Sequence, residues 1–165
     1  MTGRRYLIDG YNLLHQLPEL RRQLEYSLED SRQGLLIRLS AFASMKSTDV
    51  CVVFDGSGEF HSHDMKWRGV RIIFSKPPQK ADPLIKKMIS DRMKGEELIV
   101  VTSDREIENY ARLCGVKVES SVNFAQTILS PPGDDAEKKF DHVLSDREVE
   151  EWMRLFRGGS STEFG

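Results

Sequence analysis

The chain has 165 residues, of which 39% are hydrophobic and 30% are charged, and this composition fits one globular domain with a well-charged surface. Its 24 Lys and Arg residues against 26 Asp and Glu residues give a formal net charge of −2. This balance excludes proteins that bind nucleic acid through bulk positive charge, although it permits a local basic rim. No apolar stretch approaches the ~20 residues of a membrane span. The amino-terminal apolar run is short and ends at Asp9, so we expect no signal peptide and no membrane partner.

The two cysteines, Cys51 and Cys114, are too few for a disulfide scaffold. Both lie in apolar runs, and we interpret them as small buried hydrophobic residues. A reducing environment suits such a chain, so we expect a cytoplasmic location.

Strand-length apolar runs alternate with amphipathic segments along the chain. The runs are apolar throughout instead of alternating, which is typical of strands buried on both faces. The predicted strands cover residues 5–8, 49–54, 70–74, 97–102 and 116–119. The predicted helices cover residues 31–45, 82–93, 104–113 and 122–129. This order predicts an α/β fold with a mainly parallel sheet of about five strands between helices.

The polar composition after residue 130 marks the end of the main domain, which we place at residues 1–130. We expect residues 131–158 to form a polar excursion and a C-terminal helix that packs on the same domain. The apolar side chains for that packing are Trp152, Leu155 and Phe156. Residues 159–165 read as a flexible tail.

Acidic residues stand at the ends of the predicted strands. Asp9, Asp55 and Asp104 each lie at or just past such an end, and Asp82 begins the helix after the third strand. Ligands of an open parallel sheet bind at the carboxyl ends of its strands. If the first, second and fourth strands are neighbours, these carboxylates converge. Each acid alone also has an ordinary interpretation as a helix cap or turn residue.

Converging carboxylates need a cation or a proton, because two of them about 4 Å apart repel by roughly 4 kcal/mol at an effective dielectric constant of 20. A set of oxygen ligands without Cys or His favours Mg²⁺ or Mn²⁺ over zinc. Such a site suits phosphoryl chemistry. Asp104 also has a specific structural interpretation as part of a helix start. Ser103 and Glu106 form a capping-box pattern around it, with Ser103 as the N-cap.

Basic residues cluster in the middle third of the chain. We interpret them as a rim beside the acids that contacts the phosphates of a nucleic acid, the alternative being ordinary solvated charge. The residues of this rim are Lys66, Arg68, Lys76, Lys80 and Lys86. We read residues 56–68 as a loop whose aromatic side chains, Phe60 and Trp67, could stack on unpaired bases or belong to the core.

Four short motifs resemble those of YacP-like NYN-domain proteins, in the same order and spacing. They read LIDGYNLL at residues 7–14, VFDG at 53–56, KAD at 80–82 and VTSDR at 101–105. The resemblance covers about residues 4–129 and implies a PIN-like three-layer sandwich with metal-dependent ribonuclease activity. It implies catalytic and metal-binding roles for Asp9, Asp55, Asp82 and Asp104. It also implies that Asn12 tethers the loop carrying Asp9 and that Ser103 hydrogen-bonds near the metal or the phosphate.

Three hypotheses follow. The first is an endoribonuclease that uses Mg²⁺ or Mn²⁺ and no nucleotide cofactor, with RNA as its partner. The second is an inactive module that binds RNA or a ribosome surface. It is motivated by Gln79, Lys80, Lys86 and Lys87, which stand where the family often has further acids. The third, an aspartyl phosphotransferase, is disfavoured because Gly10 and Tyr11, not a second acid, follow Asp9.

A dinucleotide-binding site is excluded, since no Gly-x-Gly-x-x-Gly motif follows the first strand. The sequence leaves open whether a partner such as a ribosome presents the RNA. That question matters because a nearly neutral surface predicts weak affinity for free RNA.

Overall fold

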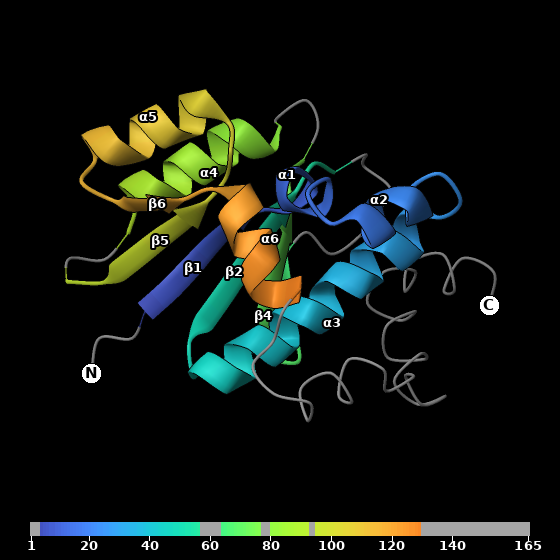
Figure 1. The fold of residues 1–165 in the computed structure, drawn as a ribbon. Coiled ribbons are helices and arrows are strands. Elements are labelled where there is room, and N and C mark those ends of the chain that lie inside the picture. Colours follow the sequence, from blue (N-terminus) through green and yellow to red (C-terminus); the bar gives the residue numbers. More distant parts are fainter. Residues whose placement is uncertain (1–3, 57–63, 77–79, 93–94, 130–165) are drawn as a thin grey trace, which may run out of the picture.

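A computed structural model describes residues 4–56, 64–76, 80–92 and 95–129. These residues form a six-stranded sheet in the order β3-β4-β2-β1-β5-β6 (Figure 1). Neighbouring strands pair in parallel except for β3 and β4, which are antiparallel. The strands are β1 (Arg4–Asp9), β2 (Asp49–Phe54), β3 (Asp64–Trp67), β4 (Val70–Phe74), β5 (Glu97–Val101) and β6 (Lys117–Glu119).

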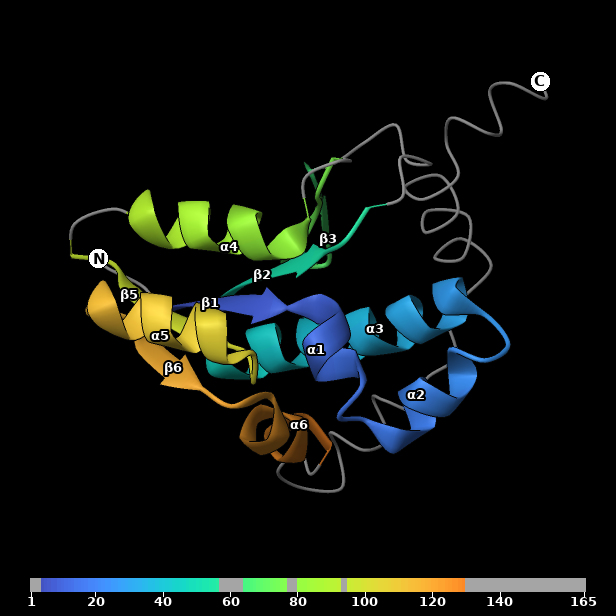
Figure 2. The ribbon, with the colours of Figure 1, turned by 90° about the horizontal axis from the view of Figure 1, so that it is seen from above.

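The sheet lies between two layers of helices (Figure 2). The helices are α1 (Gly10–Leu14), α2 (Pro18–Gln23), α3 (Leu28–Lys46), α4 (Ala81–Ser90), α5 (Arg105–Leu113) and α6 (Ser121–Leu129). One apolar core joins the sheet to α1, α2, α3 and α6, and a second joins its other face to α4 and α5. Among the described residues, no helix has the length and apolar character needed to cross a membrane.

Successive residues of the central strands pack alternately into the two cores. Tyr6 and Ile8 of β1 lie in the first core, and Leu7 lies in the second. This confirms the α/β prediction of strands buried on both faces, and each fully buried aliphatic side chain stabilises the fold by about 1.5–3 kcal/mol. Cys51 is buried in the second core and Cys114 is half-buried, and both thiols are free.

All five predicted strands and the four helices predicted before residue 130 are present, but three elements were missed. The prediction of a loop at residues 56–68 was wrong for β3, which is an antiparallel edge strand. Its side chains alternate, with Met65 and Trp67 buried and Asp64 and Lys66 exposed. Four residues are too short a window for that pattern to stand out. The other two, α1 and α2, have 5 and 6 residues, too few to show an apolar stripe.

The C-terminal part of the predicted architecture, residues 131–158 and 159–165, lies outside the described residues. The same is true of Phe60 in the predicted RNA-stacking loop.

Parallel pairing brings the carboxyl ends of β2, β1 and β5 to one edge of the sheet. Asp9 pairs with Val53, and Ile8 pairs with Val101, so the three strands end together. The convergence of the acids required β1, β2 and β5 to be neighbours, and this arrangement is confirmed.

Two glycines allow the backbone to pack closely at this edge. A Cβ on Gly10 would lie 2.5 Å from the Phe54 ring and 2.9 Å from the carbonyl oxygen of Val53. A Cβ on Gly56 would lie 2.1 Å from the carbonyl oxygen of Ser75. Both glycines directly follow a candidate site acid, so a close backbone approach helps to place Asp9 and Asp55.

We expect Gly56→Ala to lower the free energy of unfolding by about 1–3 kcal/mol, because no side-chain rotation relieves a clash with a backbone carbonyl. Gly69→Asn is the control, since Gly69 faces open space at φ +84 and asparagine tolerates this region. Urea denaturation of both variants measures the difference. Equal losses for the two variants would contradict the steric explanation.

Candidate active site

Asp9 and Asp104 are linked through Thr102, a buried residue directly after β5. The Thr102 hydroxyl donates to Asp9 Oδ2 at 3.2 Å, and the Asp104 backbone N–H donates to Thr102 Oγ1 at 3.1 Å. One hydroxyl therefore orients the carboxylate of β1 and the loop that carries Asp104. Sequence reasoning missed Thr102, although its position between β5 and Asp104 in the VTSDR motif was the available signal.

Asp104 is the N-cap of α5. Its Oδ1 accepts hydrogen bonds from the backbone N–H groups of Glu106 at 2.8 Å and Ile107 at 3.3 Å. The capping-box prediction with Ser103 as N-cap was wrong by one residue, because the helix begins at Arg105. The carboxylate thus has a structural role that uses Oδ1.

Asn12 ties α1 to the loop between β5 and α5. Its Oδ1 accepts from the Ser103 N–H at 2.8 Å and from the Ser121 hydroxyl at 2.6 Å. Ser103 Oγ in turn accepts from the Ser121 N–H at 3.1 Å. We expected Asn12 to tether the loop that carries Asp9. Through these hydrogen bonds it joins that loop to the Asp104 loop and to the start of α6. Ser121, which is fully buried, was not identified from the sequence because nothing nearby in the chain marks it.

Asp55 holds the first turn of α4 against the end of β2. Its Oδ1 accepts a hydrogen bond from the backbone N–H of Ala81 at 2.5 Å. Asp82 follows immediately in the same turn of α4. Asp82 Oδ1 is buried and has no hydrogen-bond partner among the described residues, and its nearest cation, Lys86 Nζ, is 3.8 Å away.

The acids influence one another electrostatically. The pKa of Asp9 is raised to about 6, chiefly by burial; the hydrogen bond from Thr102 opposes this rise, and the charges of Asp104, Asp55 and Asp82 contribute to it. The four predicted carboxylates therefore gather at one edge of the sheet.

A fifth acid, Glu106, joins the cluster from the first turn of α5. The pKa of Asp82 is raised by burial first, and next by Glu106 and Asp104, against the opposing effect of Lys86. Among the residues that the structure describes, no three His, Cys, Asp or Glu side chains approach closely enough to hold a metal ion together. The acids are therefore neighbours but do not form a closed coordination shell.

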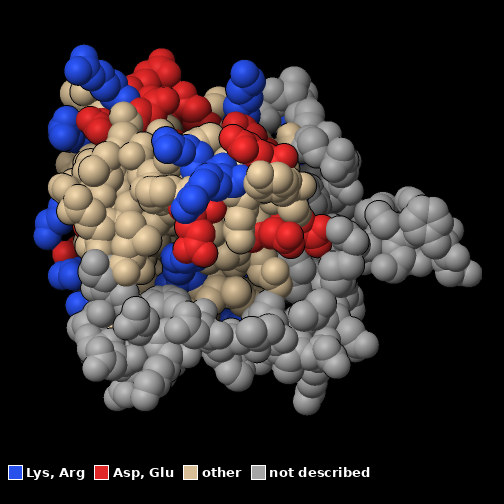
Figure 3. Space-filling model, turned by 45° about the vertical axis from the view of Figure 1, so that its right-hand side comes forward, with Lys and Arg blue, Asp and Glu red and all other residues tan. Residues whose placement is uncertain are grey.

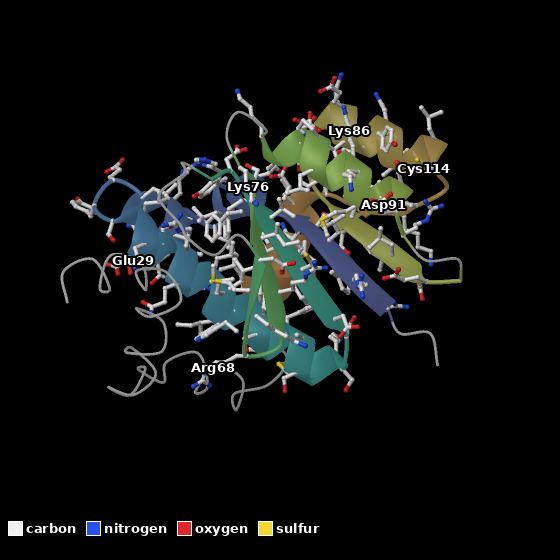
Figure 4. The ribbon with its side chains drawn as sticks, turned by 180° about the vertical axis from the view of Figure 1, so that it is seen from behind. Glu29, Arg68, Lys76, Lys86, Asp91 and Cys114 are labelled. Atoms are coloured by element: carbon white, nitrogen blue, oxygen red, sulfur yellow. The ribbon has the colours of Figure 1, made fainter. Side chains whose placement is uncertain are left out.

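The predicted basic rim is divided between two ends of the sheet. Lys76 follows the end of β4, Lys80 is the N-cap of α4, and Lys86 is on α4. Lys66 and Arg68 lie elsewhere, because the β3–β4 hairpin pairs Trp67 with Val70 and leads to the amino ends of the strands. Figure 4 shows Arg68 far from Lys76 and Lys86. The prediction that Lys66 and Arg68 flank the acids was wrong, because β3 reverses the chain direction.

The surface around this region carries charges of both signs. On the face drawn in Figure 3, Lys and Arg side chains are interspersed with Asp and Glu side chains among the described residues. This mixture matches the net charge of −2. The three basic residues of the predicted rim that lie on the side of the acids, Lys76, Lys80 and Lys86, are thus part of a surface of mixed charge.

Asp9→Asn should stabilise the metal-free protein near neutral pH. The pKa of Asp9 is raised from 3.8 to about 6, so the folded state binds the proton more tightly than the unfolded state. The resulting stability is present at low pH and is lost as the pH rises from about 4 to about 6, by up to ~3 kcal/mol. Asparagine carries no charge and removes this loss.

Denaturant titrations in EDTA at pH values of about 4 and about 7.5 measure this difference. Asp91→Asn, at a surface ion pair with Lys87, is the control and should show no comparable gain. A difference between Asp9→Asn and wild type that is the same at both pH values would contradict the raised pKa.

Comparison with known proteins agrees with this architecture. The model of the YacP-like NYN domain family matches residues 6–157 of the chain. Two crystal structures of Rae1 (YacP) from Bacillus subtilis, one of them a point mutant, superimpose with a TM-score of 0.64 at 23% identity. The mutant comparison covers 98% of this chain and 99% of that one, and the other covers 95% and 86%. No curated protein matches.

At 23% identity the structural similarity establishes the fold, and the family match covers most of the sequence. The three-layer α/β arrangement with its mainly parallel sheet is thus the PIN-like fold that the motifs implied. The chain belongs to the YacP-like NYN domain family.

Proposed function

We propose that this protein is a metal-dependent endoribonuclease whose active site is the acidic edge of the sheet. The observation that carries the proposal is the gathering of Asp9, Asp55, Asp82 and Asp104, which come from β1, the end of β2, α4 and the loop after β5. A fold gains no stability from placing four carboxylates together. Their convergence in a family with a PIN-like nuclease fold supports a catalytic role.

The residues present fit a hard divalent cation. The ligands on offer are carboxylate oxygens, and one of them, Asp82 Oδ1, is buried without a hydrogen bond among the described residues. Because no three acids of the described residues converge on one point, we propose that Asp9, Asp82 and Asp104 hold Mg²⁺ or Mn²⁺ partly through bound water, as is common for Mg²⁺ sites. When bound, such an ion lowers the pKa of a water molecule and stabilises negative charge on phosphate oxygens.

The protein's own side chains orient the reaction. Thr102 fixes the Asp9 carboxylate, and the cap bonds fix Asp104 through Oδ1, so that its Oδ2 is available. Asp55 uses Oδ1 to bind the N–H of Ala81 and is otherwise exposed. Its second oxygen is suited either to join the ligands or to accept a proton from the attacking water.

The proposed substrate is RNA, and the choice of RNA over DNA rests on the family. Lys76 and Lys80 are exposed at the same edge of the sheet and would contact phosphates on either side of the scissile bond. With mixed charges on the surrounding surface, affinity for free RNA should be weak and sensitive to salt. A partner such as a ribosome would then increase cleavage by presenting the RNA. We expect cleavage in the cytoplasm.

Asp104→Asn tests the proposal without removing the helix cap, because asparagine caps helices as well as aspartate does. We expect RNA cleavage with Mn²⁺ to fall by about 100-fold or more, since the loss of a ligand costs several kcal/mol in a metal-assisted reaction. Thermal stability should change little.

Glu108→Gln is the matched control, because Glu108 is on the same helix but pairs with Arg112. This variant should cleave RNA like the wild type. An Asp104→Asn protein that cleaves RNA as fast as the wild type would exclude the proposed mechanism.

A second candidate function is RNA binding without cleavage, and the observation that favours it is the ammonium group of Lys86 among the acids. The same assay separates the two functions. Retained, salt-sensitive RNA binding with no cleavage by the wild type in either metal would support the binding module.

A further inference from the structure

Lys86 is the basic residue of α4 that faces into the acidic cluster. Its Nζ lies 3.8 Å from Asp82 Oδ1, one turn earlier on α4, and 3.7 Å from Glu106 Oε1 on α5. It also lies 5.9 Å from the centre of the Tyr110 ring. The ammonium group therefore has two carboxylates and an aromatic face around it, contributed by two helices.

The next residue shows that this placement is specific. Lys87 is 69% exposed and forms an ordinary pair with Asp91 at 3.2 Å, whereas the Lys86 side chain is only 27% exposed. Surface pairs of the Lys87 type contribute little to stability. Lys86 instead lies between two helices, α4 and α5, which Ser90 and Tyr110 join by a hydrogen bond.

The charge balance explains what Lys86 does. Asp82 and Glu106 stand on the helix side of the cluster, and Lys86 bridges both of them. Asp9 and Asp104 stand on the strand side, where they are joined through Thr102. Among the residues described, no lysine or arginine forms an ion pair with Asp9 or Asp104 within 4 Å. In the described part of the chain, the lysine that is ion-paired within the cluster thus lies on its helix side, and the strand side is left to an external cation.

We propose that Lys86 is a resident cation of the active site, which takes the place that a second divalent ion would have between Asp82 and Glu106. The wild-type site then accepts one divalent ion, held mainly by Asp9 and Asp104, with the Asp82 carboxylate shared between this ion and Lys86. The inference deepens the proposed function and rests on it for the first ion. It assigns a role to Glu106 as the residue that positions Lys86.

Counting bound Mn²⁺ by calorimetry and by electron paramagnetic resonance tests the proposal on the full-length protein. We expect one ion per chain for the wild type and two for Lys86→Gln. Lys87→Gln, the adjacent control, should stay at one ion. Adding Glu106→Gln to Lys86→Gln should abolish the second ion, because the site would lose one of its two carboxylates.

Lys86→Met is the alternative variant if Lys86→Gln does not fold, since it keeps the aliphatic stem over Tyr110. One ion in the wild type and in every Lys86 variant would overturn the role of Lys86 and leave the proposed function intact. No ion in the wild type but one in Lys86→Gln would overturn the metal-dependent function and support the resident cation. No ion in any of these proteins would overturn both.

Discussion

The structure depends on one constraint, which is the parallel pairing of β1 with both β2 and β5. Parallel strands end at the same edge, so a residue just past each strand is brought near its counterparts without any further device. Asp9, Asp55 and Asp104 occupy such positions. The two apolar cores on either face of the sheet supply the stability that this arrangement requires.

The cost of gathering acids is reduced by helix N-termini. Asp104 caps α5, Asp55 accepts the first N–H of α4, and Asp82 lies in the first turn of α4. Backbone N–H groups and the helix dipole favour negative charge at each of these places. Asp9 also precedes a helix, but α1 has only five residues and the side chain does not cap it. Burial and neighbouring charge therefore raise its pKa to about 6.

The sequence predicted the parts of the site that lie next to strong strands. Apolar runs located β1, β2 and β5, and the acids that follow them could be read directly. Contacts between segments far apart in the chain could not be read, and Ser121, which binds Asn12, is one example. Lys86 and Glu106 are another, because their meeting depends on how α4 packs beside α5. The rim prediction failed for Lys66 and Arg68 since the short edge strand β3 turns them toward the other end of the sheet.

The central claim is that the acidic edge binds a divalent cation. Anomalous diffraction from crystals grown with Mn²⁺ tests it most directly, because it locates the ion regardless of turnover or RNA affinity. We expect an anomalous peak beside the carboxylates of Asp9 and Asp104, and no such peak in crystals of Asp9→Asn. A wild-type crystal with no peak at this edge, or with Mn²⁺ bound only elsewhere, would contradict the account.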